Sequence, residues 1–461
     1  MPPLNRRLLE TALRVASANF TISADQQRQQ WSEPTDVFSV LLLLGGEIVN
    51  KALAQLAGGS FTPVTFSFGW VSYAVTMLLA SVGEAKLMPR AADGECLVVT
   101  AKSGYTRGST SWVVSRIFHD YEAWMHPATR ARLKVMFDDR ECYMRRNARA
   151  GTKLQRPSQT GLCIAIYEPS QSSNAGEPKR DFIYWSGILV TFIQLVVAAI
   201  PFATRREWIV FLITICGTAL ALITGSLPQW REEKWACRRN THSTYILTQG
   251  NGTQHAIAIL GNGRGLNLED LAIDSQRQYN TSNCVTRFTL AATALLWICL
   301  LIVGAGVSTN TWYLLGVGIM GMVQNVLTVG WRRDPSALGV HLDFRGVIGE
   351  MTTMDSLLAL ETKHSGLGRY LLPMFFPGEL LPEENLAWEA LEATKTREDE
   401  ERRKRENHES SRADHPKEGW VAHARNFESN HPKQPRRKLH PRFRKPVPRL
   451  KLGILKRSRG L

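Results

Sequence analysis

The sequence predicts an all-α membrane protein with about six transmembrane helices in three hairpins, small mixed α/β cytoplasmic inserts and a disordered basic C-terminal tail. Two observations predict this class. The 461-residue chain contains three long apolar regions, at 36–83, 182–230 and 288–331, and polar regions separate them. About 20 apolar residues span the ~30 Å hydrocarbon core of a bilayer, so each apolar region is long enough for two spans.

The first apolar region combines a clear span with an ambiguous one. Phe61–Gly83 carries no Lys or Arg and no Asp or Glu, and it is long enough to cross. The preceding Val37–Ala57 contains Glu47 and Lys51, which are four residues apart and face one another on a helix. Each charge adds roughly a few kcal/mol to the free energy of insertion. Val37–Ala57 is therefore either a span with a paired intramembrane charge or a re-entrant or surface helix.

The central region, 182–230, is the clearest hairpin. Arg205–Glu207 divides it into two apolar halves. In the second half Gly217, Ala221 and Gly225 are spaced by four, so they form one stripe on a helix, and small residues at this spacing let helices approach closely.

The third region, 288–331, contains no Lys, Arg, Asp, Glu or His. Ser308–Asn310 divides it into two spans. Gly316, Gly318 and Gly321 match a GxGxxG pattern, but the pattern lies inside a hydrophobic span and not after a strand, so it indicates helix packing.

The two polar inserts, 84–181 and 231–287, contain the predicted β-structure. The segment LCIAIYEP near Cys163 indicates a strand, and residues 245–260 indicate a strand, a Gly-rich turn and a second strand. Asn267 precedes Leu268, Glu269 and Asp270, a pattern typical of a helix N-cap. The sequence LPQWREEKWACR joins the central hairpin to the second insert, and we expect any activity to involve it.

Six spans place both inserts and both tails on one side of the membrane. We assign that side to the cytoplasm of a plasma membrane or endomembrane, because most Lys and Arg residues near the span ends lie there. Asn251 and Asn280 oppose this orientation, since both begin sequences of the form of glycosylation acceptors. A lumenal orientation of the inserts therefore stays open.

The two ends of the chain differ from its middle. Residues 1–35 form an N-terminal tail with a short amphipathic pattern, 332–393 a juxtamembrane segment, and 394–461 a tail too poor in apolar residues to order. Formal net charge is +15, and 12 Lys and Arg with no acidic residue lie between Lys433 and Leu461. We expect the tail to contact the anionic lipid headgroups of the bilayer or to be simply solvated, and a nucleic-acid partner is disfavoured.

The most suggestive polar motif is Gly250–Gly265. Within it Gly261, Gly263 and Gly265 follow an apolar strand and precede a helix, so they are weak candidates for binding a phosphate or nucleotide. The GK[ST] ending and the GxGxxG spacing of known nucleotide loops are both missing. Tight turns are the alternative interpretation of these glycines.

The sequence predicts no catalytic residue, no metal site and no cofactor. Its histidines are isolated, and no spaced carboxylates, nucleophile elbow or kinase motifs accompany them. Whether the protein is an enzyme stays open.

Several segments resemble a family of uncharacterised multi-pass membrane proteins of filamentous fungi. They include DVFSVLLLLGGEIVNKALAQL, SGYTRGSTSWVVSRI, GTALALITGSLPQWREEKWACR, LTQGNGTQHAIAILGNGRGLNLEDLA and MFFPGELLPEENLAW. The resemblance covers roughly residues 35–390 and excludes the basic tail. It implies a membrane protein whose core includes Glu47 and Lys51, and it implies no activity.

The sequence is therefore compatible with three functions. The first is a non-enzymatic membrane protein whose cytoplasmic inserts form one interaction or sensing module with protein partners that are still unknown. The second is a transporter or channel-like protein that uses Glu47 and Lys51. The third is a membrane-bound enzyme or nucleotide-binding protein that uses Gly250–Gly265.

Overall fold

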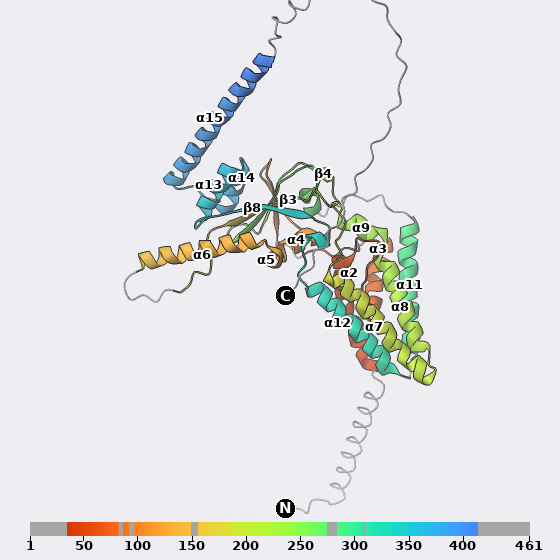
Figure 1. Cartoon of the computed structure of the whole chain (residues 1–461). Coiled ribbons are helices and arrows are strands. Elements are labelled where there is room, and N and C mark those ends of the chain that lie inside the picture. Colours follow the sequence, from red (N-terminus) through yellow and green to blue (C-terminus); the bar gives the residue numbers. More distant parts are fainter. Residues whose placement is uncertain are drawn as a thin grey trace, which may run out of the picture. The chain divides into compact units, whose positions relative to one another are not determined.

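A computed structural model of the chain describes residues 35–82, 86–91, 96–148, 155–273, 284–307 and 309–413. The amphipathic N-terminal pattern, Asn280 and the basic run after Lys433 lie outside these residues. The described helices and strands form a helical bundle and a sheet module, drawn in Figure 1. The bundle helices are α2 (Thr35–Leu56), α3 (Gly69–Val82), α7 (Phe182–Arg205), α8 (Ile209–Gly225), α9 (Pro228–Lys234), α11 (Cys284–Ala305) and α12 (Thr311–Gly330).

The bundle contains the helices that indicate a membrane protein. Three helices in the described part of the chain, α7, α11 and α12, are long and apolar enough to cross a bilayer. The bent pair of α8 and α9 makes a fourth if it counts as one span. Local sequence sets both ends of α7. Asp181 caps its start, and Arg206, with φ of 55° in the left-handed region, ends it at the turn to α8.

The first apolar region differs from the predicted hairpin. Only Gly69–Val82 of the expected Phe61–Gly83 span is helical, and the buried residues before it are extended. After α2, the chain lies beside the end of α9 at Gly58, which packs on the ring of Trp235. It lies beside α9 again at Met88, whose N–H donates to Glu233 (2.9 Å).

Between these points the chain reaches the middle of the bundle, where Gly69 packs on the backbone of Gly45 in α2. The described residues 58–82 and 86–88 therefore enter the bundle and return to the end where they started. Pro63, which has no backbone N–H to donate to a helix, lies in the extended part, Gly58–Phe68, hereafter the re-entrant segment.

The polar regions contain β-structure, as predicted for the inserts, but they build one six-stranded mixed sheet in the order β2-β1-β5-β6-β3-β8, so the chain as a whole is not all-α. Its pairs are antiparallel except β3 with β6. The strands are β1 (Leu97–Thr100), β2 (Tyr105–Gly108), β3 (Cys163–Pro169), β5 (Tyr245–Thr248), β6 (His255–Ile259) and β8 (Leu342–Gly349). Both inserts and the chain after α12 therefore contribute to one sheet, and β4 (Arg239–Thr241) pairs with β7 (Gly265–Leu266) beside it.

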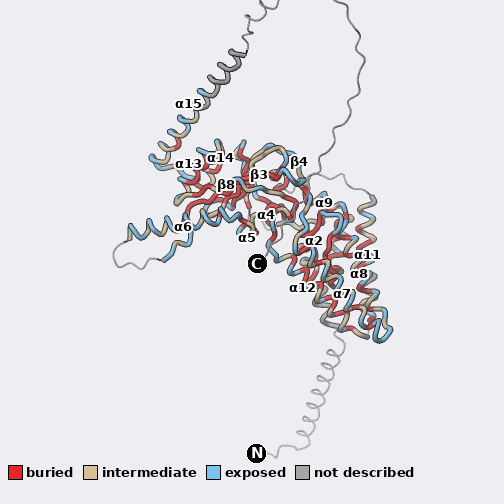
Figure 2. Tube along the Cα trace, viewed as in Figure 1, coloured by how far each residue is buried: buried red, intermediate tan, exposed pale blue. Residues whose placement is uncertain are grey.

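The sheet is covered on both faces because its side chains alternate between two cores. Ala165 and Ile257 face one core and Ile164 and Ala256 the other. The first core includes residues of α4 (Trp112–His119), α5 (Tyr121–Trp124) and α10 (Leu268–Ala272). The second includes residues of α13 (Thr353–Lys363) and α14 (Leu367–Phe375). Figure 2 shows the resulting concentration of buried residues in the strands and in the bundle interior.

Two further helices complete the described chain. α6 (Pro127–Asn147) packs against β3 and β8 and is otherwise mostly exposed. α15 runs from Pro382 to Ala413, so the predicted disorder from Thr394 is wrong as far as Ala413. Within 332–393, β8 lies at the opposite edge of the sheet from β2.

Candidate functional site

The end of α2 is the most strongly organised polar site in the described chain. The last carbonyl groups of a helix have no intrahelical partners and carry a partial negative charge. Lys234 of α9, which is fully buried, supplies partners: its Nζ donates to the carbonyl oxygens of Ala54 (2.8 Å), Gln55 (3.3 Å) and Ala57 (2.7 Å). A lysine, which usually lies at the protein surface, thus supplies the hydrogen-bond donors for the carbonyl groups at the end of a buried helix.

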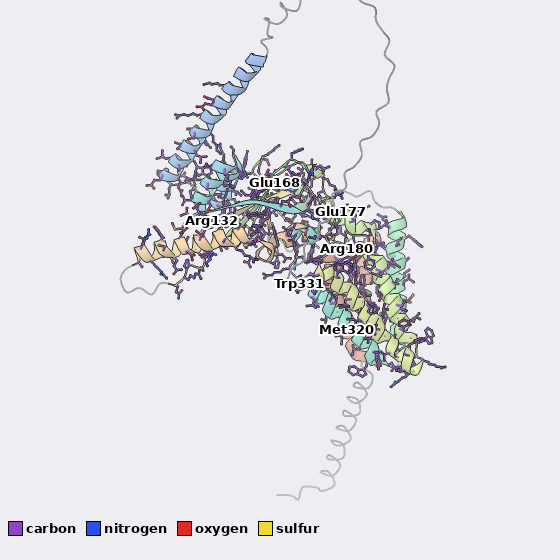
Figure 3. The ribbon with its side chains drawn as sticks, in the orientation of Figure 1. Arg132, Glu168, Glu177, Arg180, Met320 and Trp331 are labelled. Atoms are coloured by element: carbon purple, nitrogen blue, oxygen red, sulfur yellow. The ribbon has the colours of Figure 1, made fainter. Side chains whose placement is uncertain are left out.

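Arg333 extends this site to two further helices. Its guanidinium donates to Gln55 O (2.5 Å) and to both carboxylate oxygens of Asp181 (2.6 and 2.9 Å). Asp181 in turn accepts from the N–H of Tyr184 (3.1 Å) and so caps α7. Because Arg333 follows α12, its hydrogen bonds connect the end of α12 to the start of α7, through Asp181, and to the end of α2, through Gln55. Figure 3 labels Arg180 and Trp331 at these ends of α7 and α12.

Asp120 connects the same site to the sheet module. Its buried carboxylate accepts from the backbone N–H of Arg333 (3.0 Å) and from Nε of Arg116 (2.9 Å), and Nδ1 of His119 lies 3.0 Å away. Arg116, in α4, also donates to the carbonyl oxygen of Trp331 (2.9 Å). We call Arg116, Asp120, Asp181, Lys234 and Arg333 the junction cluster. The two arginines of the cluster face its two carboxylates, and the carbonyl groups at the end of α2 accept from Lys234.

The re-entrant segment is held by side chains of the surrounding helices. Gln194 of α7 donates to Phe66 O (2.8 Å), and Asn325 of α12 donates to Thr65 O (3.2 Å). In return Thr62 Oγ1 donates to Gly225 O (2.7 Å). Backbone outside helices is tolerated at membrane depth where protein buries it and supplies partners.

The predicted small-residue stripe packs against this segment. Gly217 contacts the ring of Phe66, Gly225 contacts Thr62, and Ala221 is fully buried between them. In α12, a Cβ at Gly318 would overlap the ring of Phe68 and one at Gly321 would overlap Phe66 O. These glycines therefore pack on the extended chain as well as on neighbouring helices, since a Cβ at Gly225 would also meet Leu53 of α2 and one at Gly321 would also meet Gln194 of α7.

Glu47 and Lys51 form the expected pair on α2, with 2.6 Å between Oε1 and Nζ. The side chain of Glu47 is 76% exposed and that of Lys51 37% exposed, so the pair lies on the outside of the bundle. It borders a surface cavity between α2 and α4. The structure therefore places the pair away from the buried interior that a transport path through the bundle would use.

The glycines of the Gly250–Gly265 loop pack against their own module. Gly261 packs on the backbone of His242, and Gly263, with φ of +82°, packs on the ring of His242. Gly265, in β7, contacts Pro169. Asn267 caps the following helix as predicted, with its side chain accepting from the N–H of Asp270 (3.0 Å), but that helix, α10, has only five residues.

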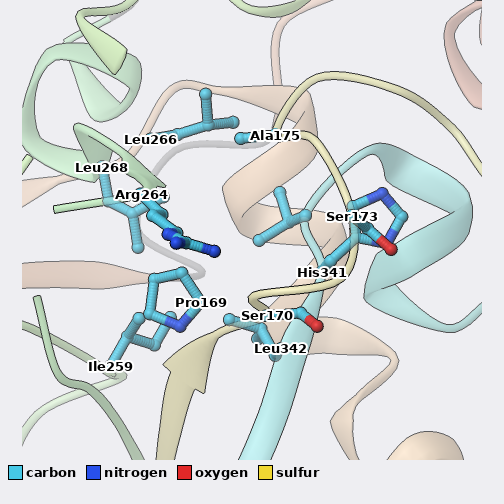
Figure 4. Close-up of a pocket in the computed structure, with 12 residues that line it drawn as sticks. Pro169, Ser170, Ser173, Ala175, Ile259, Arg264, Leu266, Leu268, His341 and Leu342 are labelled. Atoms are coloured by element: carbon cyan, nitrogen blue, oxygen red, sulfur yellow. The ribbon is translucent and has the colours of Figure 1, made fainter. Parts of the chain in front are cut away.

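The pocket beside these glycines is small. Figure 4 shows it between Pro169, Arg264 and His341, and its volume is about 20 Å³. A cavity of this size holds about one water molecule. The guanidinium of Arg264 is already engaged, since it donates to Gln171 O (3.0 Å). Within the described residues, no group of three or more His, Cys, Asp or Glu side chains is placed to hold a metal ion.

Comparison of the chain with protein-family models, with curated proteins and with solved structures gives no match.

Sequence reasoning missed the chemistry of the junction cluster but pointed to one part of it. Lys234 lies in the LPQWREEKWACR segment that was singled out as the link between membrane core and insert. Asp120, Asp181 and Arg333 are each adjacent to an element boundary, where a charge is usually solvated. Only the packing of α2 against α9 and α12 reveals that these charges are buried together.

Proposed function

We propose that this protein is a non-enzymatic, multi-pass membrane protein whose sheet module is an interaction or sensing unit fixed to the membrane helices. One observation carries the proposal: a single sheet, built from three separate parts of the chain, is joined to the ends of α2, α7 and α12 by the buried junction cluster. A domain attached in this way cannot move freely on a linker, so a partner bound to it acts directly on the helix ends.

The proposal includes a topology of five crossings. α2, α7, α8, α11 and α12 cross, and residues 58–88 enter from the sheet side and return to it. Arg180, Arg231 and Arg332 near the helix ends favour the cytoplasm for that side, because basic residues are more frequent in cytoplasmic loops. The N-terminal tail then lies on the opposite side, which differs from the six-span arrangement.

Labelling of cysteines in sealed vesicles tests this topology. Cys142 on α6 is exposed and reports on the sheet side, and a Glu207→Cys variant reports on the turn between α7 and α8. We expect an impermeant maleimide to reach these two positions from opposite sides of the membrane. Labelling of Cys142 from the lumenal side would contradict the cytoplasmic assignment.

The edge strand β2 is the best-placed surface for a partner. The N–H of Ser109 donates to Cys96 O (2.8 Å). Hydrogen-bonded and non-bonded residue pairs alternate along an antiparallel ladder, so Arg107 and Tyr105 direct their backbone N–H and C=O groups toward β1. Thr106 and Gly108 therefore direct their N–H and C=O groups away from β1. Both residues are exposed, so a peptide strand from a partner can pair with this edge.

A proline at the edge provides the test. Thr106→Pro removes an outward-facing N–H and leaves the hydrogen bonds to β1 in place, whereas Thr106→Val keeps the N–H and serves as the matched control. We expect cross-linked partners of the full-length protein to be lost in Thr106→Pro and retained in Thr106→Val, with equal unfolding temperatures. Identical partner sets in wild type and Thr106→Pro would overturn partner binding at this edge.

A further inference from the structure

The strand β2 is an open edge of the sheet. Thr106 and Gly108 direct their backbone N–H and C=O groups away from β1, and both residues are exposed. Nothing among the described residues lies within 4 Å of a Cβ placed on Gly108, so the described chain leaves room beside this end of the strand. An edge strand with unpaired backbone groups is a template for pairing with another chain.

The side chains of β2 on one face of the sheet complement each other. Arg107 pairs with Val98, a residue of the first core, so Arg107 and Tyr105 both lie on that face. The Tyr105 side chain is 50% exposed, and the guanidinium of Arg107 lies 4.5 Å from the centroid of its ring. Glu269 of α10 holds Arg107 in place, with 3.5 Å between Nε and Oε1. The edge therefore presents an aromatic ring and a cation side by side.

Two copies of β2 can pair about a two-fold axis in one favourable register. Residues that lie opposite one another keep their side chains on the same face, so the axis passes through Arg107, Tyr105 or Thr106. An axis at Arg107 brings two like charges together, which is unfavourable. An axis at Tyr105 places Arg107 opposite Ser103, which lies outside the strand. An axis at Thr106 places Tyr105 of each copy opposite Arg107 of the other, where ring and cation attract each other.

The orientation of the sheet allows this pairing between two copies in one membrane. α4 covers one face of the sheet and contacts the end of α12, because Arg116 donates to Trp331 O and Asp120 accepts from the N–H of Arg333. α13 and α14 cover the other face. One face of the sheet is therefore directed toward the bundle, and its edges point sideways along the membrane surface.

The symmetry of the two arrangements then agrees. Two antiparallel neighbouring strands are related by a two-fold axis perpendicular to their sheet. Two copies that share one orientation in a membrane are related by an axis along the membrane normal. Because the sheet faces the bundle, these two axes have the same direction, and a closed two-fold dimer is the commonest form of homo-oligomer.

We propose that the partner at β2 is a second copy of this chain, and that the two sheets join through antiparallel β2 strands. The two Thr106 residues exchange N–H and C=O groups at the axis. On either side of the axis, Tyr105 packs against Arg107 of the other copy in a non-hydrogen-bonded pair, where side chains are closest. The inference rests on the proposed function of β2 as a partner-binding edge, and it names that partner.

Disulfide trapping of the full-length protein in its membranes tests the register. The Cα atoms of a hydrogen-bonded antiparallel pair are about 5.5 Å apart, within the range of about 4.4–6.8 Å for a disulfide. We expect copper phenanthroline to produce a disulfide-linked dimer in Thr106→Cys. Lys102→Cys, at an exposed turn before β2, is the control and should give none. Both variants carry Cys142→Ser, because that cysteine is exposed.

The mass of the protein–detergent complex measures the dimer without cross-linking. We expect wild type and Thr106→Val to be dimeric and Thr106→Pro to be monomeric, with equal unfolding temperatures. Tyr105→Ala removes both contacts with Arg107, so the dissociation constant of the dimer should rise at least about fivefold. Tyr143→Ala, on the exposed face of α6, is the matched control and keeps the wild-type dissociation constant.

The outcomes separate this inference from the proposed function. A monomeric wild type that gives no disulfide dimer in Thr106→Cys would overturn the second copy as the partner. The proposed function would still stand if Thr106→Pro lost cross-linked partners, because those partners would then be other proteins. A dimer that persists in Thr106→Pro, with an unchanged partner set, would overturn both.

Discussion

The six-stranded sheet and the re-entrant segment both bury backbone that is not helical, but they satisfy its polar groups differently. In the sheet, strands pair with strands, so the hydrogen bonds do not depend on which side chains are present. In the bundle, Gln194 and Asn325 supply individual donors to the carbonyl oxygens of Phe66 and Thr65. The bundle is therefore the region where one substitution removes backbone pairing, and the following predictions test this difference.

The largest effect is expected where the two regions join. The Arg333 side chain is only 2% exposed, so Asp181→Ala leaves the Arg333 guanidinium buried without its carboxylate partner. Breaking a buried pair by removing one partner lowers the free energy of unfolding by about 3–5 kcal/mol. Thermal unfolding of the purified protein in detergent measures this change.

The exposed pair of Arg238 and Asp270 is the control for Asp181→Ala. The Arg238 side chain is 65% exposed, so solvent screens the pair and Arg238→Ala should lower the unfolding temperature far less than Asp181→Ala. Equal losses from both variants would show that the junction cluster does not couple the two regions.

The next effect is expected from steric overlap in the bundle. In Gly321→Val the new side chain overlaps the carbonyl oxygen of Phe66, a backbone atom that cannot rotate away. Overpacking of this kind is unfavourable by about 1–3 kcal/mol. Gly316→Val on the same helix is the control, because nothing lies within 4 Å of a Cβ there. Size-exclusion profiles and unfolding temperatures compare the two variants.

A smaller effect isolates the side-chain donors. Gln194→Leu removes the bonds to Phe66 O and Val317 O, and polar bonds between membrane helices contribute about 0.6 kcal/mol each. We expect a loss of roughly 1–2 kcal/mol for the two carbonyl groups together.

In the sheet, Thr106→Val should change the stability by less than about 0.5 kcal/mol, because the backbone ladder stays intact. A loss in Thr106→Val as large as that in Gln194→Leu would remove the proposed distinction between the two regions.

The smallest effect concerns pH and the sheet. Burial lowers the pKa of His255 in β6 below its usual value, with Glu122 acting weakly in the opposite direction. The unfolded chain therefore binds a proton that the folded chain resists, so stability is complete above about pH 6.5 and falls as the pH decreases below it.

We expect the difference in unfolding temperature between pH 7.5 and pH 5.5 to be smaller in His255→Leu than in wild type. The ring of His255 packs edge-on against Tyr121, and the variant keeps an apolar group there. An unchanged pH dependence in His255→Leu would exclude His255 as the cause.

Local patterns predicted much of the secondary structure. Apolar length located α7, α8, α11 and α12, short apolar runs beside Gly-rich turns located β3 and the pair of β5 and β6, and the cap at Asn267 was correct. What failed depends on contacts far apart in the chain. β8 was missed because Leu342–Gly349 contains charges and glycines and acquires a partner only from β3, about 180 residues earlier.

The junction cluster and the re-entrant segment could not be predicted for the same physical reason. Hydropathy predicts that Lys234 and Arg333 lie at the surface, because it contains no information on distant hydrogen-bond acceptors. Their acceptors are the carbonyl groups at the end of α2. Likewise the apolar composition of Phe61–Gly83 suits a helix until Gln194 and Asn325 of other helices are known to satisfy an extended backbone.

The order of strands in the sheet has a consequence for how the protein is made. β3 is synthesised before α7, yet its neighbours β6 and β8 follow α8 and α12. During translation, β3 therefore gains its partner β6 only after α8 has been made, and its partner β8 only after α12 has been made. The sheet is therefore complete only after every bundle helix has been made, and a chain that ends before Leu342 leaves β3 as an unpaired edge strand, which is prone to pair with other chains.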